Sequence, residues 1–301
     1  MEVPESILEH IKTTMARGAA QQRAAEKLTA AQLRALYEKA AVRIAARIAD
    51  AAEDASGMAL GAIQDSLRTE MERLSARTYA LTHGAQEATV RGSTAAVEAA
   101  LGPLGRFLPT GMSVTSRGSY HRIWDAAVGV LQYGVDGVEL SARIWQHLET
   151  SLQAMRGYIG EAMTGGTSKA ELYRQLKAFL VDSHVDMRYK VWRQFFKDNP
   201  PGRGKYRSAY KNVQRVLRTE TNRAYRMGMA MWSREKPWML GLRWVLSLSH
   251  PEIDICDLYA TQDVDDLGPG VYRVETVPDS AHPHCICYLD PVVDPAYLAQ
   301  P

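Results

Sequence analysis

The chain has 301 residues, of which 46% are hydrophobic, so it is long enough to bury a sizeable core and to divide into two units. No apolar run approaches the roughly 18 residues of a membrane helix, and the first residues lack the pattern of a secretory signal. A formal net charge of +2 says nothing by itself about nucleic acid, and three cysteines without a disulfide pattern agree with folding in the reducing cytoplasm.

Amphipathic helical patterns dominate the first part of the chain. Residues 4–27 predict a short helix, and a longer helix is expected to begin where Thr29 and Gln32 are typical of a capping box. Apolar residues then recur at three- and four-residue steps as far as Met58. Four glycines are expected to weaken this helical region without clearly ending it: Gly57, Gly61, Gly84 and Gly92.

Proline and glycine mark the first strong break, in the sequence LGPLGRFLPTG at 101–111. A second helical series covers residues 123–155, and its glycines between 129 and 137 predict a kink or a short interruption. This half of the chain is therefore expected to be entirely helical.

Two further helices are expected before the middle of the chain ends. Ser168 and Glu171 fit a capping box for a helix that continues to about Val181. Residues 184–197 predict a helix with an aromatic face, which is more typical of a core than of a binding platform. The sequence DNPPGRGK at 198–205 then predicts a linker, because paired prolines exclude a helix.

This linker sets the expected domain boundary. We expect a mainly helical region over residues 1–200, followed by a small mixed module over residues 201–301 that contains a helix and a short sheet. The fold class predicted by the sequence is therefore α+β.

A strongly basic helix is expected over residues 206–235. Five of its basic residues form a stripe along one face: Arg207, Lys211, Arg215, Arg218 and Arg226. Such a stripe suits DNA phosphates or an acidic protein surface, although an ordinary solvated helix face is as common. Glu220 is the sole acid between residues 201 and 226, and we expect it to pair with an arginine in a structural role.

A strand is predicted at GLRWVLSLS, residues 241–249, with the structural residue Trp244 on its apolar side together with Leu242, Leu246 and Leu248. The segment CICYL at 285–289 is expected to pair with it. A small sheet beside the basic helix would bring together the histidine and cysteine side chains that follow the first strand with those near the second strand.

Those groups form the densest chemical pattern in the sequence. Five candidate metal ligands fall within a short stretch: His250, Cys256, His282, Cys285 and Cys287. Thiolate and imidazole are the ligands of structural zinc, so the two separated groups are expected to close one tetrahedral site. Ordinary buried thiols and a disulfide remain alternatives, and the spacing leaves open which four groups would bind. The aspartates between them are more typical of a solvated loop than of a hard-cation site.

The order of these parts resembles the C-terminal domain of the Mu F-like minor head proteins of tailed phages, over about residues 206–290. The matching parts are Arg218–Glu220 (RTE), Trp244, Asp254–Asp257 (DICD), Gly268–Tyr272 (GPGVY) and His282–Cys287 (HPHCIC). Many members have a Cys-x-x-Cys pair where this chain has Ile253 and Cys256. Either His250 replaces the missing ligand or the site has lost its metal.

The resemblance implies a role in head morphogenesis. It implies a protein inside the capsid near the portal vertex, assembled in the host cytoplasm, which contacts the portal protein, the major capsid or scaffold protein, and packaged double-stranded DNA. It also implies help in genome packaging or ejection.

Two classes of function follow from these patterns. In the first, a non-enzymatic protein binds portal or scaffold through its helical region and carries a zinc-stapled module. In the second, a metal-dependent nuclease or hydrolase would use His282 or His284 to activate water at an open metal position. The sulfur-rich ligand set and the absence of a catalytic signature favour the first class.

Overall fold

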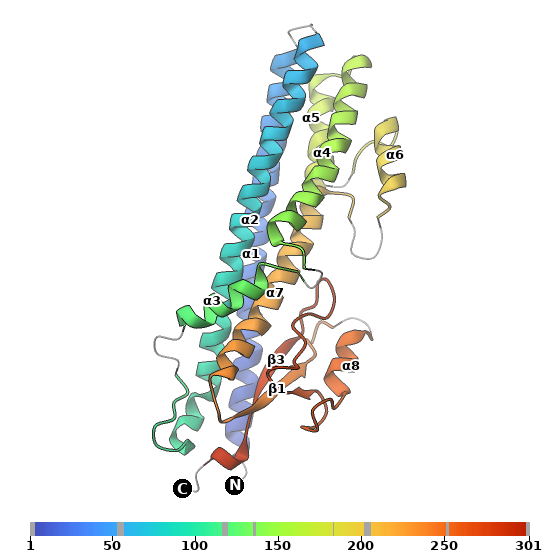
Figure 1. The fold of residues 1–301 in the computed structure, drawn as a ribbon. Helices are drawn as coiled ribbons and strands as arrows, with labels where there is room; N and C mark the ends of the chain where they lie inside the picture. The colour runs from blue at the N-terminus through green and yellow to red at the C-terminus, as the bar shows by residue number, and fades with distance from the viewer. Residues whose placement is uncertain are drawn as a thin grey trace. The chain divides into compact units, whose positions relative to one another are not determined.

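The computed structural model of the chain describes residues 4–52, 57–115, 120–134, 137–182, 184–201, 206–250 and 253–298. The chain is mainly helical up to α7, and a three-stranded antiparallel sheet lies in its C-terminal part (Figure 1). The predicted α+β class is confirmed.

Two long helices make up the N-terminal part, α1 (Glu5–Ala52) and α2 (Gly57–Leu101). The expected start at Thr29 is wrong, because α1 continues through this residue without interruption. A capping box forms only where the N-cap residue itself has a non-helical backbone. Here the alanine-rich sequence on both sides of Thr29 favours an unbroken helix.

The predicted break after α2 is confirmed. A 3₁₀ turn follows directly (η1, Gly102–Phe107), with a proline at its start. The interruption expected in the second helical series is also present, since α3 (Tyr120–Leu131) and α4 (Leu140–Thr164) are separate helices.

The next two helices differ in how well local signals predicted them. Ser168 caps α5 (Lys169–Lys177) as expected, and a π-helical turn (η2, Ala178–Asp182) extends this helix. The following helix, α6 (Lys190–Asp198), begins later than predicted. Asp186 accepts hydrogen bonds from the backbone and the guanidinium of Arg188, which stabilise a turn in place of the first helical residues. The predicted linker begins where α6 ends, but its residues 202–205 lie outside the described residues.

The C-terminal part contains α7 (Ala209–Arg234), α8 (Ile255–Thr261), three strands and a final 3₁₀ turn (η3, Pro295–Tyr297). The strands are β1 (Met239–Val245), β2 (Val271–Tyr272) and β3 (Tyr288–Val293), in the order β2-β1-β3. Both pairings are antiparallel, and Trp244 lies opposite Leu289.

The sheet differs from its prediction at one end. The central strand stops at Val245, and Leu248, which was expected on the apolar side, is fully exposed. A turn closes at this point, since the backbone N–H of His250 donates to the carbonyl of Ser247. Of the segment CICYL, only Tyr288 and Leu289 belong to β3.

The contacts divide the chain into two compact units. Unit 1 consists of Met1–Lys27, His83–Gly137 and Arg218–Pro301, and unit 2 consists of Leu28–Thr82 and Val138–Leu217. This division differs from the single boundary expected near residue 200, because α1, α2 and α7 each contribute residues to both units.

Unit 1 has one apolar core that combines distant parts of the sequence. Ile7, Ile11 and Met15 of α1 belong to the same buried cluster as Trp232 and Trp238. The rings of these two tryptophans meet edge to face, with centroids 5.8 Å apart. The start of the chain is thus part of the core that supports the C-terminal sheet.

Unit 2 is held by a buried carboxylate and an aromatic cluster. Glu70 of α2 is fully buried and forms ion pairs with Arg43 and Arg47 of α1 and with Arg73. Trp192 of α6 is fully buried and stacks on aromatic rings from two other segments of the unit. Removing the Glu70 carboxylate would leave several cations without their shared partner.

Candidate metal centre

A helix cap positions the first cysteine of the centre. Asp254 is the N-cap of α8, and its carboxylate accepts a hydrogen bond of 2.7 Å from the backbone N–H of Cys256. Asp257 completes a capping box by accepting a hydrogen bond of 2.8 Å from the backbone N–H of Asp254. The local sequence DICD therefore fixes the direction from which Cys256 enters the core.

One face of α7 holds the segment with the other two cysteines. Asn222 donates hydrogen bonds from Nδ2 to the carbonyl oxygens of Cys285 and Cys287. Thr219, one turn earlier, accepts a hydrogen bond of 3.3 Å from the backbone N–H of His284. His284 has a φ of +67°, which is uncommon for a non-glycine residue and reverses the chain just before Cys285.

The three sulfurs and one imidazole converge in the core of unit 1. The Sγ atoms of Cys256 and Cys285 are 3.5 Å apart, and the Sγ atom of Cys287 is 4.0 Å from Nδ1 of His250. Tetrahedral zinc with Zn–S bonds of about 2.3 Å places two thiolates about 3.8 Å apart. The groups therefore fit a metal ion, and this buried cluster could hold one. The disulfide alternative is wrong for this structure, since all three cysteines are free.

His250 has the orientation expected of a metal ligand. Its Nδ1 atom faces Cys287, and its Nε2 atom lies 2.9 Å from the Asp257 carboxylate. Metal-bound histidines commonly place their second nitrogen against a carboxylate, which fixes the ring and the tautomer. Asp257 thus serves both the helix cap and the imidazole, and these two contacts lower the pKa of its carboxyl group.

His282 lies at the edge of the same cluster with Cys256 and Cys285, and is a candidate fifth ligand. Its Nδ1 atom is 2.9 Å from the carbonyl oxygen of Pro283, and its Nε2 atom is 3.0 Å from the Asp254 carboxylate. Its side chain is 33% exposed, against 11% for His250. His250 is therefore the better fourth ligand.

The three thiols hold their protons unequally. Hydrogen bonds with Cys256 and Cys287, and then the charge of Arg226, lower the pKa of the Cys285 thiol against the effect of burial. Hydrogen bonds to the other two sulfurs, together with burial, raise the pKa of Cys256. For Cys287 the bond with Cys256 lowers the pKa, but the bond with Cys285 and burial outweigh it and raise the pKa to about 11. The charge of Arg226 therefore favours the thiolate form of Cys285.

The basic stripe does not form one exposed row. Arg226 is 2% exposed and lies inside unit 1, so its expected contact with DNA or a partner is wrong. Arg218 forms a 3.2 Å ion pair with Glu26, which is itself buried. Arg207 precedes α7, which begins at Ala209, and the core of unit 1 covers the face of the helix that carries Arg226.

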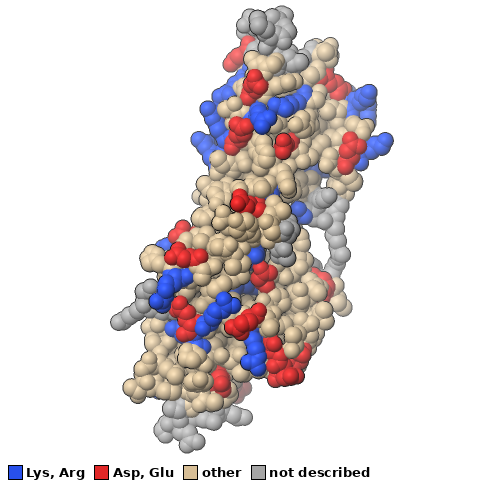
Figure 2. All heavy atoms as spheres, in the orientation of Figure 1, with Lys and Arg blue, Asp and Glu red and all other residues tan. Residues whose placement is uncertain are grey.

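The other three stripe residues lie in unit 2. Arg207 is exposed, and its guanidinium lies over the ring of Phe196, while Lys211 and Arg215 are partly exposed. On the face of the molecule drawn in Figure 2, basic and acidic side chains are intermixed.

The two expected structural residues are both buried. Glu220 is 2% exposed, lies 3.3 Å from Nε2 of Gln86 on α2, and is 4.0 Å from the guanidinium of Arg223. Trp244 is 2% exposed on β1 and meets the ring of Tyr259 edge to face. The Glu220 carboxylate thus connects α7 with α2.

Sequence reasoning missed several residues of the site. Asn222 and Arg226 bind the cysteine segment, and Asp257 orients His250. A partial signal exists, because Thr219, Asn222 and Arg226 recur at three- and four-residue steps and so share one helix face. The sequence alone does not say what that face contacts.

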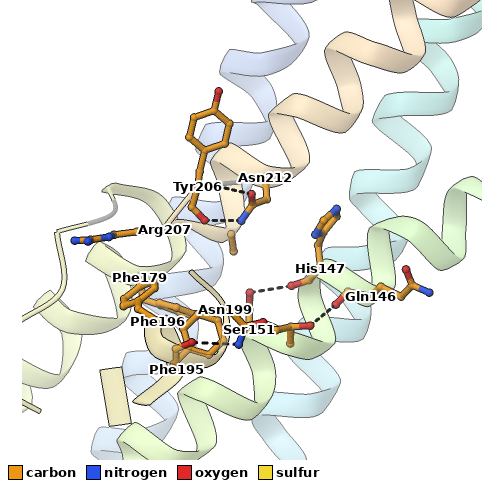
Figure 3. Close-up of a pocket in the computed structure, with 12 residues that line it drawn as sticks. Gln146, His147, Ser151, Phe179, Phe195, Phe196, Asn199, Tyr206, Arg207 and Asn212 are labelled. Carbon is orange, nitrogen blue, oxygen red and sulfur yellow. Dashed lines mark hydrogen bonds between the residues drawn. The ribbon is translucent and has the colours of Figure 1, made fainter. Parts of the chain in front are cut away.

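A pocket of about 270 Å³ lies in unit 2, and Figure 3 shows it close up. Its aromatic side comes from Phe179, Phe195 and Phe196. Two of its polar side chains bond the protein backbone: Ser151 donates to a backbone carbonyl, and so does Asn199 (Figure 3).

Comparison of the chain with protein-family models, with curated proteins and with solved structures finds no match. In the part of the chain that the structure describes, no helix is both long enough and apolar enough to cross a membrane. The chemistry of the centre and the order of motifs at residues 206–290 are therefore the basis for a functional proposal.

Proposed function

We propose that Cys256, Cys285, Cys287 and His250 hold a structural zinc ion. The observation that carries this proposal is the 3.5 Å approach of two buried sulfurs that are 29 residues apart in the sequence. Three thiolates and one imidazole fill a tetrahedral zinc shell and leave no open position for water. Zinc would connect α8 to the segment before β3. This connection matters because the strand β2 has only two residues and so adds little to the sheet.

We propose that the whole chain is a non-enzymatic minor head protein of a tailed phage, of the Mu F-like kind. The resemblance over residues 206–290 supports this, and so does the way in which its separate motifs meet. Thr219 of the RTE motif contacts His284 of the HPHCIC motif, and Cys256 of the DICD motif contacts Cys285. The motifs thus act as parts of one structural module.

The missing cysteine of the family pattern also fits this proposal. Ile253 stands in its place and is 92% exposed, whereas the imidazole of His250 lies beside Cys287. We propose that His250 replaces the absent thiolate. Zinc sites with three cysteines and one histidine are a standard structural type.

In this proposal the protein acts in head morphogenesis at the portal vertex, inside the capsid, after assembly in the host cytoplasm. Its partners would be the portal protein, the major capsid or scaffold protein, and packaged double-stranded DNA during packaging or ejection. Arg207, which is exposed, and Lys211 and Arg215, which are partly exposed, would contact DNA phosphates. Replacing all three by glutamine should weaken DNA binding and flatten its dependence on salt concentration.

The test measures metal and cleavage in the same preparation. Purified protein is assayed for zinc by mass spectrometry and is incubated with supercoiled DNA and added magnesium. About one zinc per chain without cleavage supports a structural centre, whereas cleavage that is lost in His282→Ala or His284→Ala supports the alternative metal-dependent nuclease. Copurification with the portal protein of the same phage tests the assembly role, and failure to associate at micromolar concentrations would count against it.

A further inference from the structure

Arg226 is a buried cation that contacts the candidate metal centre directly. Its side chain is 2% exposed, and its Nη1 atom lies 3.4 Å from Sγ of Cys285 and 3.2 Å from the carbonyl oxygen of Cys287. Its guanidinium also stacks over the ring of Trp244, with 5.0 Å from the central carbon to the ring centroid. The packing on both sides fixes this guanidinium against the sulfur.

A guanidinium that is removed from water needs a compensating negative charge. Among the described residues, no carboxylate lies within ion-pair distance of Arg226. Asp279 gives Arg226 only its backbone carbonyl, at 3.1 Å, while its carboxylate pairs with Arg223 at 2.8 Å. The Cys285 sulfur is therefore the group that can supply the negative charge.

The centre and Arg226 balance in charge when a divalent ion is bound. Three thiolates and a neutral imidazole around a divalent cation leave one net negative charge, which the guanidinium cancels. We propose that Arg226 is the counter-charge of the metal centre and that it makes a ligand set of three thiolates stable in the core of unit 1. Arg226 would be a positioning residue that acts through Cys285, and this inference depends on the proposed metal centre.

The first experiment measures zinc affinity by competition with a chromogenic chelator, for the wild type, Arg226→Met and Arg226→Lys. The methionine variant keeps much of the side-chain volume but loses the charge, and we expect a loss of about 10- to 100-fold in affinity, as for other groups that contact metal ligands. The lysine variant keeps the charge, so its affinity should lie within a few fold of the wild type. Arg223→Met is the matched control, since this arginine is also buried, at 4% exposed, and its described partners include no sulfur. The zinc affinity of this variant should stay within about threefold of the wild type.

The second experiment separates charge from packing. Cys256→His replaces one thiolate by a neutral imidazole and makes the loaded centre neutral, so Arg226→Met in this background should cost little or no zinc affinity. A loss of the same size in both backgrounds would show that Arg226 acts by packing alone and would overturn the proposal.

The outcomes distinguish this inference from the proposed metal centre. A wild-type protein that binds no zinc would overturn the centre and the inference together. A wild type that binds zinc, with unchanged affinity in folded Arg226→Met, would overturn the inference alone. If the methionine variant does not fold, Arg226→Lys decides, because a folded lysine variant with a large loss of affinity would contradict a role based on charge.

Discussion

Asp290 on β3 shows how burial changes the chemistry of a single carboxyl group. Burial raises its pKa from 3.8 to about 7, although Arg243, which lies opposite it on β1, and Lys12 act in the other direction. One oxygen of this carboxyl group has no hydrogen-bond partner among the described residues. The ionised form is therefore poorly accommodated in the folded protein.

This carboxyl group predicts a pH dependence of stability. Because folding raises its pKa from 3.8 to about 7, the folded state binds more protons than the unfolded state between these values, and stability falls as the pH rises through this window. Asp290→Asn should raise the free energy of unfolding by up to about 4 kcal/mol at pH 8 and by less than about 1 kcal/mol at pH 4. Denaturant unfolding at several pH values measures this, with the exposed Asp125→Asn as the control. An equal gain at both pH values would contradict the burial of a charge as the cause.

The two histidines of the centre predict a matched pair of variants. His250→Gln removes the imidazole that faces Cys287 and should weaken zinc binding at least about tenfold, because the fourth ligand is lost. His282→Gln removes a more exposed ring and should leave zinc affinity nearly unchanged. Chelator competition measures both variants, and the opposite ranking would exchange the roles of the two histidines.

Cys285→Ser should lose zinc and lower the melting temperature, and unchanged metal content would remove Cys285 from the ligand set.

At the scale of elements, the contact of α2 with α7 in unit 1 requires a glycine. A Cβ atom on Gly228 would lie 2.3 Å from Oγ of Ser93 and 3.1 Å from Cα of Val90. The second of these atoms belongs to the backbone, so the two helices would have to move apart. Glycine at this position allows α7 to lie close to α2 while its other side holds the cysteine segment.

Gly228→Ala should destabilise the protein by about 1–3 kcal/mol, because it overpacks a helix contact. Gly92→Ala on α2 is the control, since nothing lies within 4 Å of its added Cβ and alanine is the better helix former, with a gain of about 0.5–1 kcal/mol. Thermal and urea unfolding of both variants measure the difference. A stabilised Gly228→Ala would mean that the two helices are farther apart than the structure has them.

Elements whose signals are local were predictable from the sequence. Ser168 caps α5 through a bond to a residue three positions away, and the break after Leu101 depends on adjacent glycine and proline. The unbroken course of α1 through Thr29 was not predictable from the capping motif, because the cap competes with the helix on both sides of it. The end of β1 at Val245 was missed for a similar reason, since apolar alternation continues into a turn that closes at His250.

The candidate site was predictable in its composition but not in its support. The dense grouping of cysteine and histidine between residues 250 and 287 predicted that Cys256 and Cys285 lie in one site, because thiols and imidazoles are the ligands of structural zinc. The role of Arg226 could not be inferred, because the sequence predicts that an arginine on a basic helix face is exposed. Only the tertiary structure shows that it is buried. Burial by distant segments is the information that a single sequence lacks.

At the scale of the whole molecule, the candidate metal centre belongs to one unit only. All five candidate ligands lie in unit 1, and the helices α4, α5 and α6 lie entirely in unit 2. Local stability in proteins varies between such cooperative units. Loss of a metal ion should therefore loosen one unit selectively.

If the proposed zinc is bound, its removal by a strong chelator should speed amide hydrogen exchange in β1, α8 and β3 at least about tenfold, because the metal's binding energy would contribute to folding. The amides of α4 in unit 2 should exchange at an unchanged rate. Mass spectrometry of exchanged peptides measures both sets. Equal acceleration in α4 would show that the two units open together, and no acceleration anywhere would contradict a stapling role for the metal.

Unit 1 takes its core from both extremes of the chain, since Ile7 and Leu289 belong to one buried cluster. During translation, the apolar side of the first helical turns leaves the ribosome before any of its partners have been made, and residues 90–131 of the same cluster follow well before Leu289. Until about residue 290 has emerged, this core lacks its C-terminal part, and its apolar surface is incompletely covered. A stalled or truncated product would lack the closing segment, so quality control could recognise it by its uncovered first helix.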